Sequence, residues 1–335
     1  MNQTFHGLRL EAVACVVPLY DTTLGAYAER FGKDIAERYH KVVGIQRTYS
    51  VPPCDDPQPG PNPYPPLPAV GQAMDAADDI LDILRDNEAL RSEIDVLLHV
   101  TQTPHLDAPP ESCLLQRDLG LGEHVIALDI NQGCAGFMVA LQTAAHFLLH
   151  PTVRHVLICG GDVLSNRVDE NDHATAFMFS DVGFAALVGR GDGDWAFANG
   201  TAGSEAITLP HDGTFKMDGT DVFNFTVSKV PEQILSLRTP EVDCLLLHQS
   251  NAFIMRQIGR LCGFAPEQVP MNIADYGNAS SASLPLLLCD LAQNHGWRGK
   301  RTAILSGYGC GLTWVSARMP LDFDTTQFSL THYVT

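Results

Sequence analysis

The sequence lacks several features that would place it in other classes of protein. It contains no stretch of about 18 consecutive apolar residues, so we expect no membrane-spanning segment. The first residues, Met1-Asn-Gln-Thr-Phe-His-Gly7, have no basic region followed by an apolar core, which predicts no secretion signal and a cytoplasmic location. Positive charge is scarce, because 21 Lys and Arg face 39 Asp and Glu for a net charge of −18. This balance argues against nucleic acid as a partner, and it disfavours an acidic carrier protein unless a local basic patch offsets it.

The cysteines lack the spacings of a structural framework. Nine are present, at positions 15, 54, 113, 134, 159, 244, 262, 289 and 310, and no C-x-x-C pair occurs. An odd number without a secretion signal predicts reduced thiols rather than disulfides. No Cys or His cluster has the ligand spacing of zinc, so no metal site is expected. With 335 residues and 45% hydrophobic residues, the chain is typical of a globular protein with one large or two fused domains.

One stretch in the first half combines a strand, a turn and a helix around a thiol. The apolar run 125–130 predicts a buried strand, Asn131-Gln-Gly133 predicts a turn, and Cys134 begins a long segment of apolar and small residues typical of a central helix. This order places Cys134 at a helix N-terminus, where unpaired amides and the helix dipole favour the thiolate. Cys134 is therefore a candidate nucleophile. The alternative, that it is a small buried apolar residue, remains open from this stretch alone.

Apolar runs along the first half predict a buried parallel sheet. We expect strands at 8–17, 94–101, 124–130, 153–159 and 182–189, and helices at 23–40, at 70–85 and after Cys134. The helix after Cys134 joins two strands as a βαβ unit, which requires parallel neighbours buried on both faces. Nine prolines between Pro52 and Pro68 exclude regular structure there and predict a surface loop.

The second half repeats this arrangement. A strand at 242–248 ends in His248 and is followed by a helix at 251–262, and a strand at 302–306 leads to the glycine-rich Gly307-Tyr-Gly-Cys-Gly311 and a returning strand at 312–318. Each half places a reactive side chain where a strand ends and a helix begins, which is where parallel sheets bind ligands. The sequence therefore predicts an α/β fold of two similar halves, 1–190 and 191–335.

Two further polar residues are weak signals when taken singly. His248 follows four apolar residues at the end of a strand, and a lone histidine there is more often structural. Asn278 lies in a turn of small residues before a helix, where asparagine is most often a cap or turn residue.

Taken together, the motifs carry a family resemblance. Four occur in order at fitting separations: Asn131-Gln-Gly-Cys-Ala-Gly-Phe137, His248-Gln-Ser-Asn251, Tyr276-Gly-Asn-Ala-Ser-Ser-Ala-Ser283 and Gly307-Tyr-Gly-Cys-Gly-Leu-Thr-Trp314. Two more segments agree, Phe179-Ser-Asp-Val-Gly-Phe-Ala-Ala-Leu187 and Lys216-Met-Asp-Gly-Thr-Asp-Val-Phe223. The set, which spans nearly the whole chain, resembles the β-ketoacyl-acyl-carrier-protein synthase III family of the thiolase superfamily.

The resemblance implies a fold, a reaction and a set of site residues. It implies a five-layered αβαβα fold, a homodimer and a Cys-His-Asn triad at Cys134, His248 and Asn278. The thiolate of Cys134 would take an acyl group from a thioester, while the main-chain amides of Cys134 and Cys310 would form the oxyanion hole. His248 and Asn278 would then hydrogen-bond the carbonyl of a malonyl thioester and stabilise the enolate formed by loss of CO2.

The resemblance also implies how substrates are held. Acyl-CoA or phosphopantetheine-carrier thioesters are the implied substrates, with no tightly bound cofactor. Asn251 and Phe223 match positions that line the pantetheine tunnel. Arg256 and Arg260 lie one helical turn apart and could form a basic patch for a carrier protein, or simply a solvated helix face.

Several departures from the family pattern suggest a specialised paralogue. The segment 28–40 contains no tryptophan to pack on the adenine of CoA, and Gly44-Ile-Gln-Arg-Thr-Tyr49 has fewer arginines than usual. Phe253 stands where an arginine for the carrier is common, Cys310 replaces a glycine, and Ala108-Pro109 replaces a bulky aromatic that closes the acyl pocket. We therefore expect an acyl group larger than acetyl and a carrier other than CoA.

Two other functions remain as alternatives. The first is transfer of the Cys134-bound acyl group to an amine or hydroxyl acceptor without decarboxylation. Retention of Asn278 favours condensation, because transfer to oxygen or nitrogen needs no enolate stabilisation. The second is a non-catalytic subunit of a larger complex, which the complete set of three polar residues disfavours.

Overall fold

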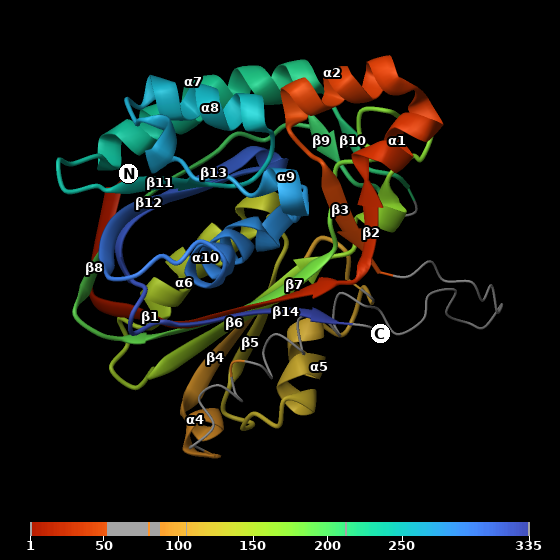
Figure 1. Cartoon of the computed structure of the whole chain (residues 1–335). Helices are drawn as coiled ribbons and strands as arrows, with labels where there is room; N and C mark the ends of the chain where they lie inside the picture. Colours follow the sequence, from red (N-terminus) through yellow and green to blue (C-terminus); the bar gives the residue numbers. More distant parts are fainter. Residues whose placement is uncertain (1, 52–79, 81–87, 105, 212, 334–335) are drawn as a thin grey trace.

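Five layers of helices and sheets build the protein, as the family resemblance predicts. The computed structural model describes residues 2–51, 80, 88–104, 106–211 and 213–333. Helices α6 (Gly136–Phe147) and α10 (Ser283–Gln293) lie between two sheets, α7 (Gly219–Leu237) and α8 (Ala252–Leu261) cover one outer face, and α5 (Glu111–Asp118) covers the other (Figure 1). The predicted αβαβα fold is confirmed. No helix in the described ranges combines the length and the apolar character that crossing a bilayer requires.

One long strand joins the two sheets. The strand order is β11-β12-β13-β8-β1-β7-β6-β4-β5. The bounds are β1 (Asn2–Pro18), β4 (Ile94–Val100), β5 (Ile126–Ile130), β6 (His155–Asp162), β7 (Val182–Arg190), β8 (Gly193–Thr201), β11 (Cys244–Leu247), β12 (Lys300–Gly309) and β13 (Thr313–Asp322). The start of β1 pairs with β8, and its later residues pair with β7, with register shifts after Phe5 and Leu10. These irregularities let β1 pass from one sheet to the other.

The two halves of the chain share this junction. Strand β14 (Gln327–Tyr333) returns to pair in parallel with β1, from Ala12 opposite Gln327 to Pro18 opposite Tyr333. A C-terminal strand thus completes the sheet that the first half supplies. The predicted boundary between residues 190 and 191 lies at the end of β7, where the turn to β8 begins. The assignment of 1–190 and 191–335 as separate domains stays a prediction.

The two central helices are buried to different extents between the sheets. All ten residues from Ser283 to Ala292 of α10 are buried, whereas α6 buries Phe137, Met138, Leu141 and their small neighbours and leaves His146 exposed. A helix that is buried on every side, such as α10, is stable only when surrounded by other elements. The small residues of α6, including Ala140, Ala144 and Ala145, let the sheets approach closely. The predicted central helix after Cys134 is confirmed.

The predicted βαβ unit is also present. Strands β5 and β6 both pair in parallel with β4, so that Val100 lies opposite Ile130 on one side and Gly160 on the other. The carboxyl ends of the three strands therefore meet at one edge of the sheet. However, the prediction that 125–130 is buried is wrong. Strand β5 is the last strand of the sheet, and Ile126 and Leu128 are 46% and 42% exposed. A buried strand and an edge strand with an exposed apolar face can have the same apolar run, so the sequence pattern alone does not distinguish them.

Other elements differ from the prediction in their bounds. The expected helix 23–40 is two helices, α1 (Leu24–Phe31) and α2 (Lys33–Val43), separated by Gly32 at φ +94°. The smaller elements are β2 (Tyr20–Thr23), β3 (Arg47–Ser50), α4 (Glu88–Glu93), β9 (Ile207–Thr208), β10 (Lys216–Met217) and α9 (Ile273–Tyr276). The proline-rich segment 52–68 and nearly all of the expected helix 70–85 lie outside the described residues.

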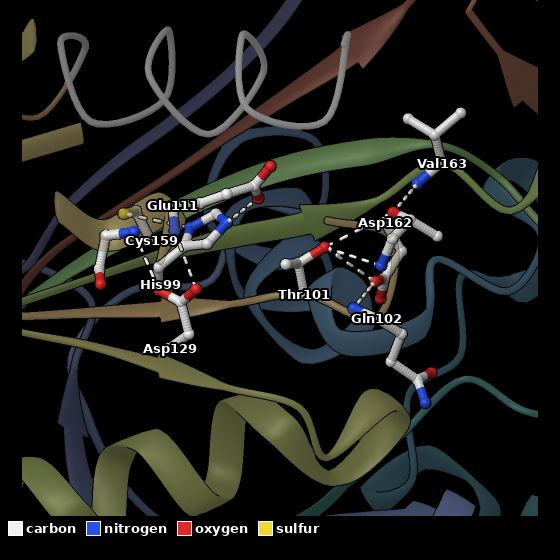
Figure 2. Close-up of polar contacts among 10 residues, drawn as sticks. His99, Thr101, Gln102, Glu111, Asp129, Cys159, Asp162 and Val163 are labelled. Atoms are coloured by element: carbon white, nitrogen blue, oxygen red, sulfur yellow. Dashed lines mark hydrogen bonds and ion pairs between the residues drawn. The ribbon is translucent and has the colours of Figure 1, made fainter. Parts of the chain in front are cut away.

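A buried ion pair attaches α5 to the sheet. His99 of β4 donates a hydrogen bond through Nε2 to Glu111 Oε2 at 3.1 Å, and both side chains are buried (Figure 2). Burial alone would lower the pKa of His99, but hydrogen bonds with Cys159 and Glu111 raise it to about 10. The carboxylate of Asp129 on β5 accepts the main-chain N–H groups of Glu111 and Ser112 at 2.9 Å each. These contacts fix the start of α5 against β4 and β5.

Candidate active site

Residues distant in the sequence meet around one cavity. A cavity of about 150 Å³ is lined by Cys134, His248 and Asn278, and also by Asn251 and Cys310. Cys134 follows β5, His248 follows β11, Asn278 follows α9, and Cys310 follows β12. The structure thus brings together five of the predicted site residues at the ends of strands and at turns, where parallel sheets place ligand sites. The apolar part of the lining is formed by Leu164, Met178, Phe179, Ile207, Phe215, Met217, Val222 and Ile254.

Two glycines allow Cys134 to occupy its position. Gly133 has φ +47°, and a Cβ there would lie 2.3 Å from Gln102 Oε1, so only glycine fits this turn. Cys134 follows in the single 3₁₀ turn η1 (Gly133–Ala135), directly before α6. From the opposite side, a Cβ on Gly309 would lie 2.8 Å from Cys134 Cβ and 3.3 Å from its sulfur. The main chain at the end of β12 therefore packs directly against the thiol.

The surroundings of Cys134 favour the neutral thiol. Burial raises its pKa to about 12; the contact with Ser280 Oγ at 3.9 Å lowers it, and the nearby Asp162 and Cys310 raise it further. The expectation from the helix N-terminus is the opposite direction. Cys134 does precede α6, but loss of hydration is the largest influence on its pKa. The thiol is consequently protonated at neutral pH in the free protein.

His248 is a buried neutral imidazole. Burial lowers its pKa to about 3, so the ring carries no charge in the physiological pH range. Its Nδ1 lies 2.6 Å from Ser283 Oγ, while Tyr308 packs edge-on at 5.5 Å between ring centroids and donates from its hydroxyl to the His248 carbonyl at 3.3 Å. Within the described part of the chain Nε2 has no hydrogen-bond partner, so it is the ring nitrogen available to a ligand in the cavity.

Asn278 is held by its main chain and by one side-chain atom. Its N–H donates to the Met178 carbonyl at 3.0 Å, and its carbonyl accepts from the Ser180 N–H at 2.9 Å. The side-chain Oδ1 accepts from the Ser280 N–H at 2.9 Å. Ser280 adopts φ +48°, which is uncommon for a residue with a side chain. The side-chain oxygen is thus occupied, and the NH2 group of Asn278 has no protein partner among the described residues.

The buried carboxylate of Asp162, which sequence analysis did not identify, holds segments next to the cavity by hydrogen bonds. Asp162, at the end of β6, accepts from the Gln102 N–H at 2.6 Å and from Thr101 Oγ1 at 3.4 Å (Figure 2). It also accepts from Ser281 Oγ at 3.1 Å. Its charge is one of the causes of the raised pKa of Cys134. A residue after Gly160-Gly161 gives no sequence signal of this role, because its partners come from separate segments.

The predicted substrate-binding residues lie in different surroundings. Asn251 caps α8, its Oδ1 accepting from the N–H groups of Phe253 and Ile254, and also lines the cavity. Phe223 does not line it; its ring stacks on that of Phe253 at 6.1 Å between centroids. Arg256 is exposed on α8 and also lies outside the lining. In the described ranges no three His, Cys, Asp or Glu side chains gather as a metal site.

The fold and the site together define a thiolase-like enzyme with a cysteine at the N-terminus of its central helix. Comparison with family models matches residues 128–205 to 3-oxoacyl-[acyl-carrier-protein (ACP)] synthase III and residues 234–320 to the C-terminal region of the same family. The first match contains Cys134, and the second contains His248 and Asn278.

Individual proteins agree with the family models. The chain is 34% identical over 246 residues to a β-ketoacyl-[acyl-carrier-protein] synthase III of Oceanobacillus iheyensis, covering 70% of this chain and 78% of that one. The crystal structure of a 3-oxoacyl-(acyl-carrier protein) synthase from Burkholderia xenovorans matches 99% of both chains with a TM-score of 0.87 and 26% identity. The priming β-ketosynthase of the R1128 polyketide pathway matches 95% and 97% with a TM-score of 0.81 and 23% identity.

The chain therefore belongs to the 3-oxoacyl-[acyl-carrier-protein] synthase III family, and it is an enzyme of the acyltransferase class. The resemblance seen in the four motifs is confirmed.

The raised pKa of Cys134 predicts how its reactivity depends on pH. Because the thiol is protonated below a pKa of about 12, the thiolate fraction grows with pH. We expect alkylation by iodoacetamide to accelerate about tenfold per pH unit between about pH 7 and about pH 10, without a plateau. Peptide mass spectrometry measures the rate, and the exposed Cys113 in the same samples serves as a reference for the reagent. A plateau in the Cys134 rate near neutral pH would contradict this assignment.

Proposed function

We propose that the protein forms a carbon–carbon bond by loading an acyl group on Cys134 and condensing it with a malonyl thioester, giving a β-ketoacyl product. The observation that carries this proposal is the meeting of Cys134, His248 and Asn278 around one cavity, with two neutral hydrogen-bond donors left without protein partners. Family membership supports the same chemistry.

In the loading step the sulfur of Cys134 attacks the carbonyl carbon of an acyl thioester. A new sulfur–carbon bond forms, the bond to the donor's sulfur breaks, and the proton of the Cys134 thiol leaves with the donor as its free thiol. Because the attacking form is the thiolate and burial favours the thiol, the proton passes from Cys134 to the donor's sulfur as the new bond forms. The main-chain N–H groups of Cys134 and Cys310 are the proposed oxyanion donors, and the close packing of Gly309 on Cys134 supports this placement.

In the condensation step the malonyl thioester loses CO2, and the electron pair of the broken bond becomes an enolate. Neutral His248 and the NH2 group of Asn278 donate hydrogen bonds to the enolate oxygen. The enolate carbon then attacks the acyl carbon, and Cys134 leaves as a thiolate that takes a proton from solvent. Transfer of the acyl group to oxygen or nitrogen would leave these two donors without a role, so we favour condensation over that alternative.

The substrate assignment follows from the cavity and its mouth. The apolar lining, with Met178, Phe179 and Phe215, suits the hydrocarbon part of an acyl thioester larger than acetyl. Segment 28–40 has no tryptophan to pack on the adenine of CoA, so we propose that a phosphopantetheine carrier protein, rather than CoA, delivers the substrate. Phe253, which stands where the family commonly has an arginine for the carrier, stacks on Phe223, and Arg256 on the same helix is the proposed contact for the acidic carrier. Asn251 and Phe223 are proposed to contact the pantetheine chain.

The protein is proposed to be a homodimer. Each chain is proposed to consist of two similar halves, 1–190 and 191–335, and the proposed location is the cytoplasm. Strand β5 ends the sheet and exposes Ile126 and Leu128 on one face. An exposed apolar edge strand on a folded chain is a site for pairing with a second copy. In such a dimer Ala108 and Pro109, which follow β4, are proposed to leave room for a large acyl group.

The assigned roles predict that Asn278→Ala separates the two steps. The variant should keep acyl loading of Cys134 but lose condensation by about a hundredfold, the scale of one lost oxyanion donor. Intact-mass spectrometry follows the acyl-enzyme, and release of ¹⁴CO2 from labelled malonyl carrier follows condensation. Asn272→Ala is the matched control, because Asn272 is buried and its NH2 group has no described partner, yet it does not line the cavity. Equal loss of both steps in Asn278→Ala would refute the assignment.

The substrate proposal predicts selective loading. A panel of acyl donors, from acetyl to long-chain and each supplied on CoA and on a carrier protein, should load Cys134 fastest with a group larger than acetyl on the carrier. Intact-mass trapping reads out each donor, and Cys134→Ala should accept none. Fast turnover with acetyl-CoA would overturn the specialised assignment while leaving the condensation itself intact.

The dimer proposal predicts that charge on β5 separates the subunits. Replacing Ile126 and Leu128 together by lysine should give monomers in sedimentation velocity, because two buried ammonium groups would lose their hydration at the interface. Leu149→Lys is the control, since Leu149 is 64% exposed and follows α6 rather than belonging to this strand. A dimer that survives the double substitution would place the interface elsewhere.

A further inference from the structure

His248 has one buried partner that the proposed function does not use. Ser283 is the first residue of α10, its side chain is buried, and its Oγ lies 2.6 Å from His248 Nδ1. This is the only hydrogen bond that the imidazole makes with a residue in the described ranges. A neutral imidazole carries one hydrogen, on Nδ1 or on Nε2, and the partner of one nitrogen decides which tautomer is present.

The surroundings of Ser283 favour one direction for this hydrogen bond. The main-chain N–H of Gln249 also reaches Ser283 Oγ, at 3.4 Å, and a main-chain N–H can only donate. The serine oxygen therefore accepts from Gln249, and its own hydrogen has no acceptor other than Nδ1 among the described residues. With Nδ1 accepting, the single ring hydrogen is on Nε2, the nitrogen without a described protein partner.

We propose that Ser283 is a positioning residue, whose hydroxyl donates to Nδ1 and holds neutral His248 in the tautomer with its hydrogen on Nε2. This inference rests on the proposed condensation, in which the imidazole must donate to the enolate oxygen. The opposite tautomer would present a lone pair to that oxygen and repel it. Loading of Cys134, which uses main-chain donors, does not need the tautomer.

The same segment orients the second donor. Asn278 Oδ1 accepts from the Ser280 N–H at 2.9 Å, which directs the amide so that its NH2 group remains for a ligand. Residues 278–283 thus set both donors, one through a main-chain N–H and the other through a hydroxyl. Their sequence, Asn278-Ala-Ser-Ser-Ala-Ser283, contains both serines that make these contacts.

The tautomer can be measured directly in the unmodified protein. In ¹⁵N spectra of protein labelled at histidine, His248 is identified as the signals missing from His248→Ala. We expect its Nε2 to carry the hydrogen and its Nδ1 to be an unprotonated acceptor at neutral pH. A hydrogen on Nδ1 would overturn the proposal. This readout does not depend on turnover, so an absence of condensation with every donor would refute the proposed function and leave the tautomer assignment standing.

Variants of Ser283 test the consequence for catalysis. In Ser283→Ala we expect the condensation kcat to fall about tenfold, the scale of one lost hydrogen bond, with loading of Cys134 unchanged and a mixture of tautomers in the ¹⁵N spectrum. Ser283→Thr keeps the hydroxyl and should restore both. Ser316→Ala is the control, because it removes an equally buried serine hydroxyl that bonds Ser306 and Gln233 away from the cavity. A Ser283→Ala enzyme with unchanged condensation and tautomer, or with loading and condensation lowered equally, would overturn the proposal.

Discussion

The site depends on burial of Cys134 and His248, neither of which has a cation among the described groups that shift its pKa. The pKa of Cys134 is raised and that of His248 is lowered, in both cases first of all by loss of hydration. Both groups are therefore neutral in the free protein, and negative charge that develops during the reaction meets oriented N–H groups rather than cations. In surroundings of low dielectric constant, fixed dipoles are stronger than in water and need no reorganisation. Because burial disfavours the charged thiolate, the Cys134 thiol keeps its proton until the sulfur of the donor accepts it.

The fold meets this constraint by placing main chain, rather than flexible side chains, around the sulfur. Gly309 at the end of β12 packs against Cys134, and the Phe179–Asn278 bridge fixes the turn that carries the carboxamide. Helices α6 and α10 begin at this point, and both are buried between the sheets (Figure 1). Because interiors are packed as densely as organic crystals, a displacement of either helix would leave cavities or overlaps. The geometry of the site is consequently as rigid as the core.

The sequence is sufficient to predict the α/β fold class and the central helix, because these depend on apolar periodicity. The meeting of Cys134, His248 and Asn278 is predictable only through the family resemblance that the motifs carry together. The sequence is insufficient where an outcome depends on the balance of opposing effects or on partners far away in the chain. The direction of the Cys134 pKa shift is one example, since the helix end and burial act oppositely. The exposure of β5 is another example, because the residues of a strand do not show whether it lies in the middle or at the edge of its sheet. Asp162 accepts hydrogen bonds from two segments, one with Thr101 and Gln102 and the other with Ser281. Phe223 contacts Phe253 and does not line the cavity.

The two donors without protein partners face the cavity and not the packed core. His248 Nε2 and the NH2 group of Asn278 are not among the described buried side-chain atoms that lack a hydrogen-bond partner, so both are reached from the cavity. Both residues lie beside α10, whose first ten residues are buried. A ligand carbonyl can accept from both donors, and an enolate oxygen accepts more strongly because it carries charge. The hydrogen bonds are therefore stronger to the enolate than to the ground-state carbonyl, which is the difference in binding that accelerates a reaction.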